Sequence, residues 1–397
     1  MKRSVNIKYF LLIIFFVFNS FSVSTSIVDM DELDKVERKN KSLGLALSYY
    51  PEDLTKDVSH KLDSVFTRFN KRYDFHGSVI VAKKGKVIFK NQYGYADFRQ
   101  KTKLDENSIF QLASVSKQFT ATAIMILKER GQLNLDDEVT KFYPEFPYEK
   151  VTIRHLLNHT SGLPKYFWLA EHKWDKDYPP SNEEMMDLMA TSDVQRFFSA
   201  GANFDYSNTG YMVLASIVEK VTAMPYGDFV QTNIFEPLQM KSTFVYRYEQ
   251  DSIVENQLAG YRIYRRRYHA AIGGTVNDRI VGDKNVYSTT EDMLKWIQGL
   301  NSGKIVSETT LSEMYSKGET KYKRKVPYGF GFRIKEDEAG KVVYHNGKWN
   351  GFTTSLMQYP EDELVVITLE HSNYNSMKNL NLTVKNIVDE HFTAPVN

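Results

Sequence analysis

The sequence predicts an α/β protein in which an antiparallel sheet, built from both ends of the chain and flanked by helices, carries an inserted all-α lobe. Strand-like segments occur at residues 77–97 and again at residues 327–370, whereas residues from about 115 to 320 are mostly helical or irregular in pattern. Strands at both ends with helices between them indicate one sheet with an insertion. The 397 residues could hold two or three average domains or one large bilobed domain. The strand pattern favours one domain over residues 57–397.

The first 26 residues have the pattern of a secretory signal peptide. They contain a basic start, a short apolar run and small residues suited to cleavage: Lys2, Arg3, Lys8, residues 9–18, Ser22, Ser24 and Ser26. The apolar run is short for a membrane span, so an uncleaved anchor is the alternative. We expect export to the periplasm or envelope of a bacterium, or secretion, with membrane contact only if the segment stays uncleaved.

Residues 27–97 predict the first half of the sheet and its approach. Residues 27–56 begin with a highly charged stretch and read as a stalk or loosely packed lead-in. Residues 57–72 carry apolar side chains at helical spacing. Residues 77–97 then read as two strands joined at Lys84 and Gly85.

The rest of the chain predicts helices first and strands last. Residues 119–127 are apolar or small almost all the way round, which is typical of a helix enclosed by the core. Further helices are expected from about 181, from about 209 and, with Ser288 and Glu291 at capping-box spacing, to about residue 300. Antiparallel strands are expected at 327–334, 341–347, 352–360 and 363–370, with a final helix from near Asn375.

Composition excludes several classes of function. The formal net charge of +2 gives no sign of a nucleic-acid-binding protein. Arginines and tyrosines alternate in residues 261–269, which could contact an anionic polymer, but we interpret this stretch as a solvated hairpin or loop. The chain has no cysteine, which excludes disulfides, a cysteine nucleophile, thiolate metal sites and lipid attachment through cysteine.

Ser114 and Lys117 form a candidate catalytic pair at the head of the predicted buried helix. Residues three apart on a helix lie on one face, so the hydroxyl and the amine can meet. A lysine removed from water has a lowered pKa, and its free amine can take the serine proton. An N-cap serine followed by a lysine that extends to solvent is the structural alternative. Ser114 is the only serine in the chain with a lysine three residues later.

Tyr206 and Asn208 are the second candidate pair, in the segment FDYSNTGY just before a predicted helix. A phenol near a lysine can relay a proton, and an amide can bind a substrate carbonyl. The same spacing recurs at Tyr344 and Asn346, but inside a predicted strand. We therefore favour the first pair.

His345 and Gly347 lie in the predicted strand that contains YHNG. A glycine in a strand often marks the close approach of another backbone or a ligand. An ordinary edge-strand histidine is the alternative reading of His345.

The three segments ASVSKQFTA, FDYSNTGY and YHNG, in this order, resemble the S-x-x-K, Y-x-N and K/H-x-G motifs of serine β-lactamase-like hydrolases. That family includes class C β-lactamases, D-alanyl-D-alanine carboxypeptidases, D-amino-acid peptidases and β-lactamase-type esterases. The stretches GQLNLDDEVTKFYPEFP and VTIRHLLNHTSGLP are also similar to the family, and the resemblance covers roughly residues 60–390. It implies a β-lactamase/transpeptidase-like fold with the site between the sheet lobe and the helical lobe.

The resemblance also implies roles for individual residues. Ser114 would be acylated, and Lys117 would accept or relay its proton. Tyr206 would act as general base and acid, while Asn208 would bind the substrate amide. Main-chain N–H groups of Ser114 and Lys348 would form the oxyanion hole, next to Gly347. His345 stands where many members carry lysine, so we expect weak antibiotic hydrolysis and a carboxylate preference that grows as the histidine takes up its proton.

Three alternatives differ in chemistry. His155 and His159 are four apart like a zinc pair, but the segment HLLNH lacks the glutamate of H-E-x-x-H, so we expect no metal and no cofactor. No serine lies in G-x-S-x-G, which argues against an α/β-hydrolase. A penicillin- or muropeptide-binding receptor with little turnover remains open. The expected partner is a small-molecule or peptidoglycan-derived substrate.

Overall fold

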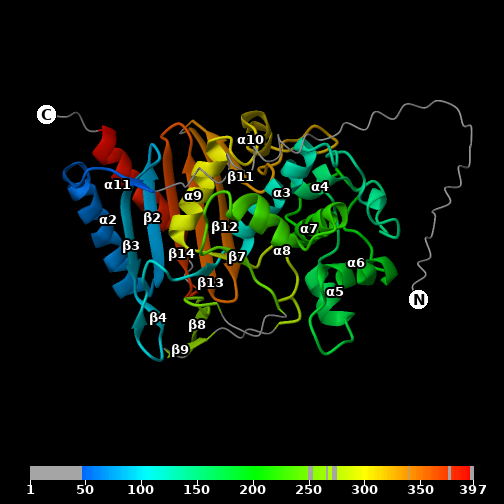
Figure 1. Ribbon diagram of the computed structural model, residues 1–397, viewed down its shortest axis with the longest axis horizontal. Coiled ribbons are helices and arrows are strands. Elements are labelled where there is room, and N and C mark those ends of the chain that lie inside the picture. The colour runs from blue at the N-terminus through cyan, green and yellow to red at the C-terminus, as the bar shows by residue number, and fades with distance from the viewer. Residues whose placement is uncertain are drawn as a thin grey trace, which may run out of the picture. The chain divides into compact units, whose positions relative to one another are not determined.

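The computed structural model describes residues 47–248, 254–264, 267–270, 275–338, 340–373 and 377–393, with side chains of 263–270 and 393 left aside. These residues belong to one compact unit of the chain, Leu43–Asn397 (Figure 1). The predicted signal segment and most of the charged lead-in fall outside the described residues, as does part of the basic stretch at 261–269. Within the described ranges, no helix is both long and apolar enough to cross a membrane.

A seven-stranded sheet joins the two ends of the chain, as the sequence predicts. Its strand order is β1-β3-β2-β14-β13-β12-β11, and all neighbours are antiparallel except β1 and β3. The N-terminal strand β2 pairs with the C-terminal strand β14, with Ile80 opposite Ile367. The strands are β1 (Ser48–Tyr49), β2 (Gly77–Lys83), β3 (Lys86–Tyr93), β11 (Arg333–Asp337), β12 (Gly340–Trp349), β13 (Phe352–Tyr359) and β14 (Leu364–Glu370).

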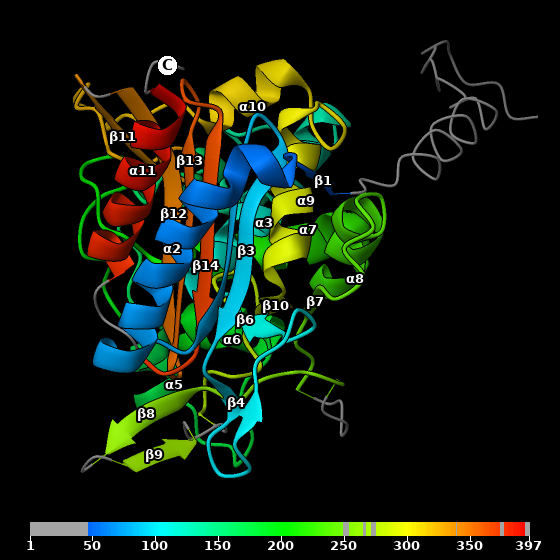
Figure 2. The same ribbon diagram turned by 90° about the vertical axis from the view of Figure 1, so that its left-hand side faces the viewer.

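Two helices, α2 (Glu52–Tyr73) and α11 (Met377–Thr393), cover one face of this sheet. Figure 2 shows both helices in front of the strands, with α9 (Thr290–Asn301) and the rest of the inserted lobe behind. Val58, Leu62 and Phe66 of α2 are fully buried in this layer. Helix α2 begins at Glu52, five residues before the predicted start. Acidic Glu52 and Asp53 lie in its first turn, where their negative charges interact favourably with the helix dipole.

The segment between β3 and β11 forms the inserted lobe. It contains the small strands β4 (Tyr95–Asp97), β5 (Thr102–Lys103), β6 (Phe110–Gln111), β7 (Phe244–Val245), β8 (Tyr261–Tyr264), β9 (Arg267–Ala270) and β10 (Val286–Ser288). Its helices are α3 (Lys117–Glu129), α4 (Ile153–Leu157), α5 (Tyr166–His172), α6 (Asn182–Thr191), α7 (Asn208–Thr222), α8 (Tyr226–Val230), α9 (Thr290–Asn301) and α10 (Glu308–Met314). Short helical turns are η1 (Ala113–Ser116), η2 (Val139–Lys141) and η3 (Gln231–Phe235).

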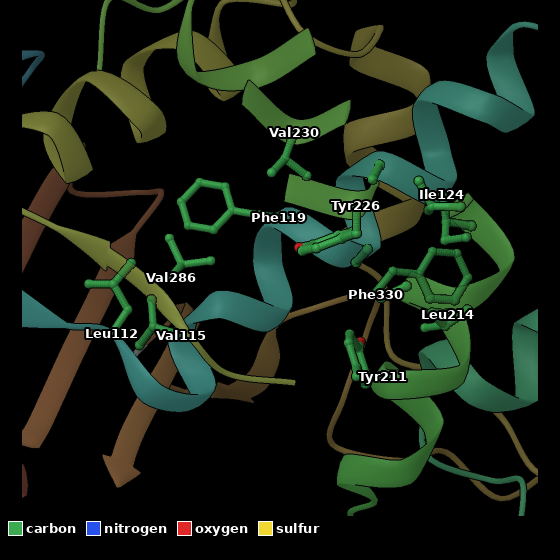
Figure 3. Close-up of a cluster of buried hydrophobic side chains, with 14 of the residues drawn as sticks. Leu112, Val115, Phe119, Ile124, Tyr211, Leu214, Tyr226, Val230, Val286 and Phe330 are labelled. Atoms are coloured by element: carbon green, nitrogen blue, oxygen red, sulfur yellow. The ribbon is translucent and has the colours of Figure 1, made fainter. Parts of the chain in front are cut away.

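Helix α3 lies inside this lobe and is buried from Lys117 to Leu127, which confirms the predicted enclosed helix. Phe119 and Ile124 lie among apolar side chains of α7, α8 and β10, including Leu214, Val230 and Val286 (Figure 3). The head of α3 is thereby fixed where the lobe meets the sheet.

Two further predicted elements begin at different residues in the structure. Helix α9 is capped by Thr289, whose hydroxyl accepts from the Asp292 N–H, while Ser288 is the last residue of β10. The strand predicted at 327–334 starts only at Arg333, because the chain before it turns back on itself. There Gly329 donates its N–H to the Phe332 carbonyl oxygen over 2.8 Å, and Gly331 has a φ of 81°.

Candidate active site

Ser114 lies on the turn η1, which leads directly into α3. The turn is held on both sides, since the Leu112 N–H donates to the Val286 carbonyl oxygen over 2.8 Å and the Thr354 hydroxyl donates to the Leu112 carbonyl oxygen over 2.7 Å. Ala113 has a φ of 49°, a left-handed conformation that is strained for a residue with a side chain. The strained residue immediately precedes Ser114, which is partly exposed.

Gly347 of β12 is the point where the sheet meets this turn. A Cβ atom at this position would lie 2.3 Å from the Leu112 carbonyl oxygen, 2.4 Å from the Thr354 hydroxyl and 3.0 Å from the Ala113 Cβ. The close backbone approach predicted for this glycine is therefore present. Lys348 follows on β12 beyond the stretch that pairs with β11, which ends at Tyr344. The expected oxyanion hole, from the N–H groups of Ser114 and Lys348, remains a prediction at this contact.

Substituting Gly347 should therefore damage the site more than a glycine-to-alanine change elsewhere. In Gly347→Ala the added carbon meets backbone, so η1 or β12 must move; overpacking typically costs about 1–3 kcal/mol. A displacement of about 1 Å can reduce the rate about 10²-fold. Gly227→Ala is the matched control, because its Cβ would lie 3.4 Å from Val245. Equal kcat/KM in the two variants, measured with an activated ester, would contradict this placement.

Lys117 is fully buried and meets three acceptors. Its Nζ lies 3.3 Å from the Ser114 Oγ, 2.8 Å from the Asn208 Oδ1 and 2.8 Å from the Asp283 carbonyl oxygen. Burial lowers the pKa of Lys117 to about 8, with Asp283 opposing this shift and Arg333 adding to it. Lys117 is therefore held by hydrogen bonds and can exist as a free amine near neutral pH.

Tyr206 and Asn208 come together with the first pair, from the loop before α7 and the first residue of α7. The Tyr206 ring lies 5.1 Å from the Lys117 Nζ. Its hydroxyl oxygen is buried and has no hydrogen-bond partner of acceptable geometry among the described residues, although Ser114 lies close enough to affect its ionisation. Burial raises the pKa of Tyr206, only partly offset by Ser114 and Arg333. The phenol is thus protonated at neutral pH.

His345 lies close to Tyr206, with ring centroids 6.1 Å apart, but it is fully buried. Its Nε2 is 2.9 Å from the Tyr328 hydroxyl and its Nδ1 is 2.8 Å from the Asn346 carbonyl oxygen. Since a carbonyl oxygen only accepts, Nδ1 carries the proton and Nε2 accepts from Tyr328. Burial, with Lys117 and Arg333 nearby, holds the pKa of His345 well below 6.5. The expectation that His345 titrates near its ordinary pKa is therefore wrong.

The two histidines weighed as a zinc pair have separate structural roles. The His155 Nδ1 lies 3.2 Å from the Thr152 main-chain nitrogen, from which it accepts to complete a capping box at the start of α4. The His159 Nδ1 accepts from the Ser207 N–H over 3.0 Å, and its ring lies 4.3 Å from that of Tyr206. His159 therefore supports the loop that carries Tyr206.

Sequence reasoning missed Arg333, the first residue of β11. Its guanidinium carbon lies 4.8 Å from the centre of the Tyr206 ring, and the side chain is partly exposed. Within the described residues, no ion pair with a carboxylate is found for it. Arginine keeps its charge at any ordinary pH, so a permanent cation lies beside the catalytic candidates. No local motif marks it, because only the fold brings β11 to Tyr206.

A small cavity of about 60 Å³ lies beside Tyr206 and Asn208. Apolar Leu163, Phe167 and Phe197 form part of its wall. A cavity needs about 10–15 Å³ to hold one water molecule, so this cavity has room for a methyl or short alkyl substituent.

The Beta-lactamase family model matches residues 62–388. The chain belongs to the Beta-lactamase family. Penicillin-binding protein 4* of Bacillus subtilis is 33% identical over 325 residues, which cover 78% of this chain and 71% of that protein. Teichoic acid D-alanine hydrolase of Staphylococcus aureus is 28% identical over 307 residues, which cover 74% of each chain. Some other curated relatives are longer, and the chain covers 64% of their length.

Solved structures of the family share the fold. The octameric penicillin-binding protein homologue from Pyrococcus abyssi is 26% identical, with a TM-score of 0.71 over 83% of this chain and 77% of that chain. The predicted family and its β-lactamase/transpeptidase-like fold are thereby confirmed. Relatives with a hydrolase activity in their names support a serine hydrolase.

Proposed function

We propose that this protein is an exported serine hydrolase that forms a covalent acyl-enzyme with an amide or ester, such as a D-amino-acid peptide, a β-lactam or a small ester. One observation carries the proposal: a fully buried Lys117, with a pKa of about 8, lies 3.3 Å from the Ser114 hydroxyl. A buried lysine with so low a pKa is poorly suited to a purely structural role and well suited to taking the serine proton.

In the acylation step, the Ser114 oxygen bonds to the substrate carbonyl carbon and its proton passes to the Lys117 Nζ. The carbonyl oxygen gains negative charge, which the N–H groups of Ser114 and Lys348 would stabilise. When this intermediate collapses, the bond from the carbonyl carbon to the leaving nitrogen or oxygen breaks, and the leaving group takes up a proton. Asn208 would hold the substrate amide while its Oδ1 keeps Lys117 in place. In the second step a water oxygen bonds to the acyl carbon, the bond from that carbon to the Ser114 oxygen breaks, and the Ser114 oxygen regains a proton, by the reverse sequence of proton transfers.

Tyr206 is the better acid for the leaving group. Its raised pKa keeps the phenol protonated, so it can donate to the departing amine or alkoxide. The phenolate that remains is re-protonated from Lys117, whose Nζ lies 5.1 Å from the ring centre. This division assigns Lys117 as the base and Tyr206 as the acid, in place of a tyrosine that does both.

The substrate we favour has a small acyl side chain and an anionic group near the bond that is cleaved. The 60 Å³ cavity beside Asn208 suits the methyl group of alanine. A relative named teichoic acid D-alanine hydrolase supports D-alanine as the acyl group. With His345 neutral, Arg333 is the cation positioned to bind a carboxylate, as in a terminal D-alanine or a β-lactam.

Arg333→Gln should therefore lower kcat/KM for carboxylate-bearing substrates about 10- to 100-fold, since hydrogen bonds to charged groups contribute about 1.5–3 kcal/mol. Neutral esters with the same leaving group should lose much less. Because Arg333 also lowers the pKa of Lys117, the two substrates are compared as a ratio within each variant, so that this shared effect cancels. A ratio unchanged by the substitution would remove Arg333 as the carboxylate ligand.

The function is tested with a fluorescent penicillin and a panel of p-nitrophenyl esters and D-alanyl peptides. Steady turnover of an ester or amide, with an acyl adduct visible by intact mass, is the expected result. An adduct that forms without turnover would instead favour a penicillin- or muropeptide-binding receptor. Export is tested separately, by N-terminal sequencing of the protein from the cell envelope, which should begin near residue 25 or 27.

A further inference from the structure

A second lysine, Lys284, is buried close to the site together with Asp283. Their side chains are 3% and 1% exposed, and the Lys284 Nζ lies 3.5 Å from the Asp283 Oδ1. Lys284 also donates to the Tyr166 hydroxyl over 2.6 Å, and that hydroxyl donates to the Asp283 Oδ2 over 3.0 Å. The three side chains thus close a ring of polar contacts. A buried pair of charges persists only where such contacts offset the loss of water.

Aromatic rings enclose the other side of Lys284. Its Nζ lies 5.2 Å from the ring centre of Tyr166 and 5.3 Å from those of Phe167 and Trp349. Phe167 from α5 and Trp349 from the end of β12 stack on each other with centroids 5.2 Å apart. The cation therefore binds rings from both the inserted lobe and the sheet, at a place that water does not reach.

This cluster connects to the catalytic amine through two separate contacts. The Asp283 carbonyl oxygen accepts from the Lys117 Nζ over 2.8 Å. The Tyr166 N–H donates to the Thr209 hydroxyl over 2.9 Å. Thr209 directly follows Asn208, whose Oδ1 is the other close acceptor of the Lys117 Nζ. Tyr166 thus ties together the two chain segments that supply acceptors to Lys117.

We propose that Tyr166, Asp283 and Lys284 form a buried positioning unit behind Lys117, which fixes the acceptors of the catalytic amine and balances two opposite charges beside it. The side chains of the three residues do not touch the reacting atoms in the mechanism above; Asp283 meets the Lys117 Nζ only through its main-chain carbonyl oxygen. None of the three lies in a motif of the sequence. The inference rests on the proposed function, because it assigns these residues to the same proton transfer.

The electrostatic consequence follows from the groups that face Lys117. The Asp283 carboxylate raises the pKa of Lys117, while burial and Arg333 lower it. Burial lowers the pKa of Lys284, Asp283 and Asp278 oppose this shift, and the charge of Lys117 adds to it. The interaction is mutual, so Lys284 also disfavours the charged form of Lys117. Other groups also face Lys117, namely Ser114 of η1, His159 after α4, Tyr206 before α7, Asn208 and Tyr211 of α7, Arg333 of β11 and His345 of β12.

Two single variants should move the pH profile in opposite directions. In Asp283→Asn the carboxylate is lost and Lys284 is left unbalanced, so the acidic limb of kcat/KM should move to lower pH. In Lys284→Met the cation is lost and Asp283 is left unbalanced, so the limb should move to higher pH. We expect shifts of about 0.5–1 pH unit each, from the size of charge effects at short range. The double variant should return the limb close to its wild-type position.

A purely structural pair would not produce this pattern. Loss of stability alone would lower activity in both variants without moving the limb in opposite directions. Lys141→Met, which removes a surface lysine paired with Asp137, is the control and should leave the limb in place. Limbs that stay fixed, or that move in the same direction in both single variants, would overturn the proposal.

Tyr166→Phe keeps the inference testable if either charge variant fails to fold. It removes only the hydroxyl and leaves the main-chain bond to Thr209, so kcat should fall about tenfold with KM nearly unchanged. An unchanged kcat would overturn the proposal. All measurements use the full chain, with a neutral p-nitrophenyl ester as substrate and circular dichroism as the check on folding. If the wild type forms no acyl adduct the proposed function fails; if it does, but the shifts are absent, only the positioning role fails.

Discussion

Ser114→Ala should abolish acylation while leaving the fold intact. Loss of a nucleophile typically reduces turnover on the order of 10⁴–10⁶-fold. Incubation of the wild type with a penicillin or an activated ester should add one acyl mass, and the variant should show none. The substitution removes a partly exposed hydroxyl that lies 3.3 Å from the Lys117 Nζ and close to Tyr206, so melting should change little.

Ser64→Ala is the matched control for this experiment. Ser64 is an exposed serine of α2, on the layer that covers the other face of the sheet. Its loss should affect neither adduct nor turnover. An adduct that forms on Ser114→Ala at the wild-type rate would transfer the nucleophile to another residue and remove the basis of the mechanism.

The catalytic pair could be predicted from sequence because its geometry is local. Ser114 and Lys117 are three residues apart at the head of one helix, so their spacing alone brings the hydroxyl and the amine together. Gly347 was also predictable, since a glycine inside a strand indicates a close approach. That these residues meet in one site was predicted only from the family resemblance, which rests on the order of the three motifs. Local rules of helix and strand geometry do not predict which distant segments meet.

Arg333, Asp283 and Lys284 could not be predicted, because no local pattern distinguishes them from surface residues. Each reaches the site through tertiary contacts: Arg333 lies over Tyr206, and Lys284 lies against rings from α5 and β12. The prediction that His345 takes up a proton near its ordinary pKa failed for the same reason. Its pKa depends on burial and on Lys117 and Arg333, which are distant in the sequence.

The fold was predictable where periodicity was strong and less so at element boundaries. The hairpin of β2 and β3 and the enclosed helix α3 follow directly from apolar runs and turn residues. The segment before β11 has a strand-like alternation of apolar residues and glycines, but this pattern reflects packing in a turn and not pairing in a sheet. A Cβ at Gly329 would lie 2.1 Å from the Met314 carbonyl oxygen, so this glycine serves a close contact in a turn.

Lys117→Met should lower kcat/KM about 10²–10⁴-fold, the usual contribution of a general base. In the wild type, kcat/KM should rise with pH up to about 8, where the buried amine loses its proton. The variant should lack this limb. Tyr206→Phe should lose a similar factor on amides and poor leaving groups, because it removes the proposed proton donor. Lys128→Met, at the other end of α3, is the control.

The same substitution should change how stability depends on pH. The unfolded chain keeps the Lys117 proton up to its ordinary pKa of 10.5, whereas the folded protein releases it near pH 8. Between these values the unfolded state binds one more proton at Lys117, so the contribution of Lys117 to the free energy of unfolding rises with pH. The full rise is about 3 kcal/mol, from about 1.4 kcal/mol for each unit of pKa difference.

Lys117→Met should lose that rise, because methionine has no proton to release. At pH 7 the variant avoids a buried ammonium, although Asn208 and Asp283 lose their donor, which offsets part of the gain. The difference in unfolding free energy between wild type and variant, measured by urea denaturation from pH 7 to 10.5, isolates Lys117 from all other titrating groups. A difference that does not change over this range would mean that Lys117 keeps its ordinary pKa in the folded protein. It could then not act as the free amine that the mechanism requires.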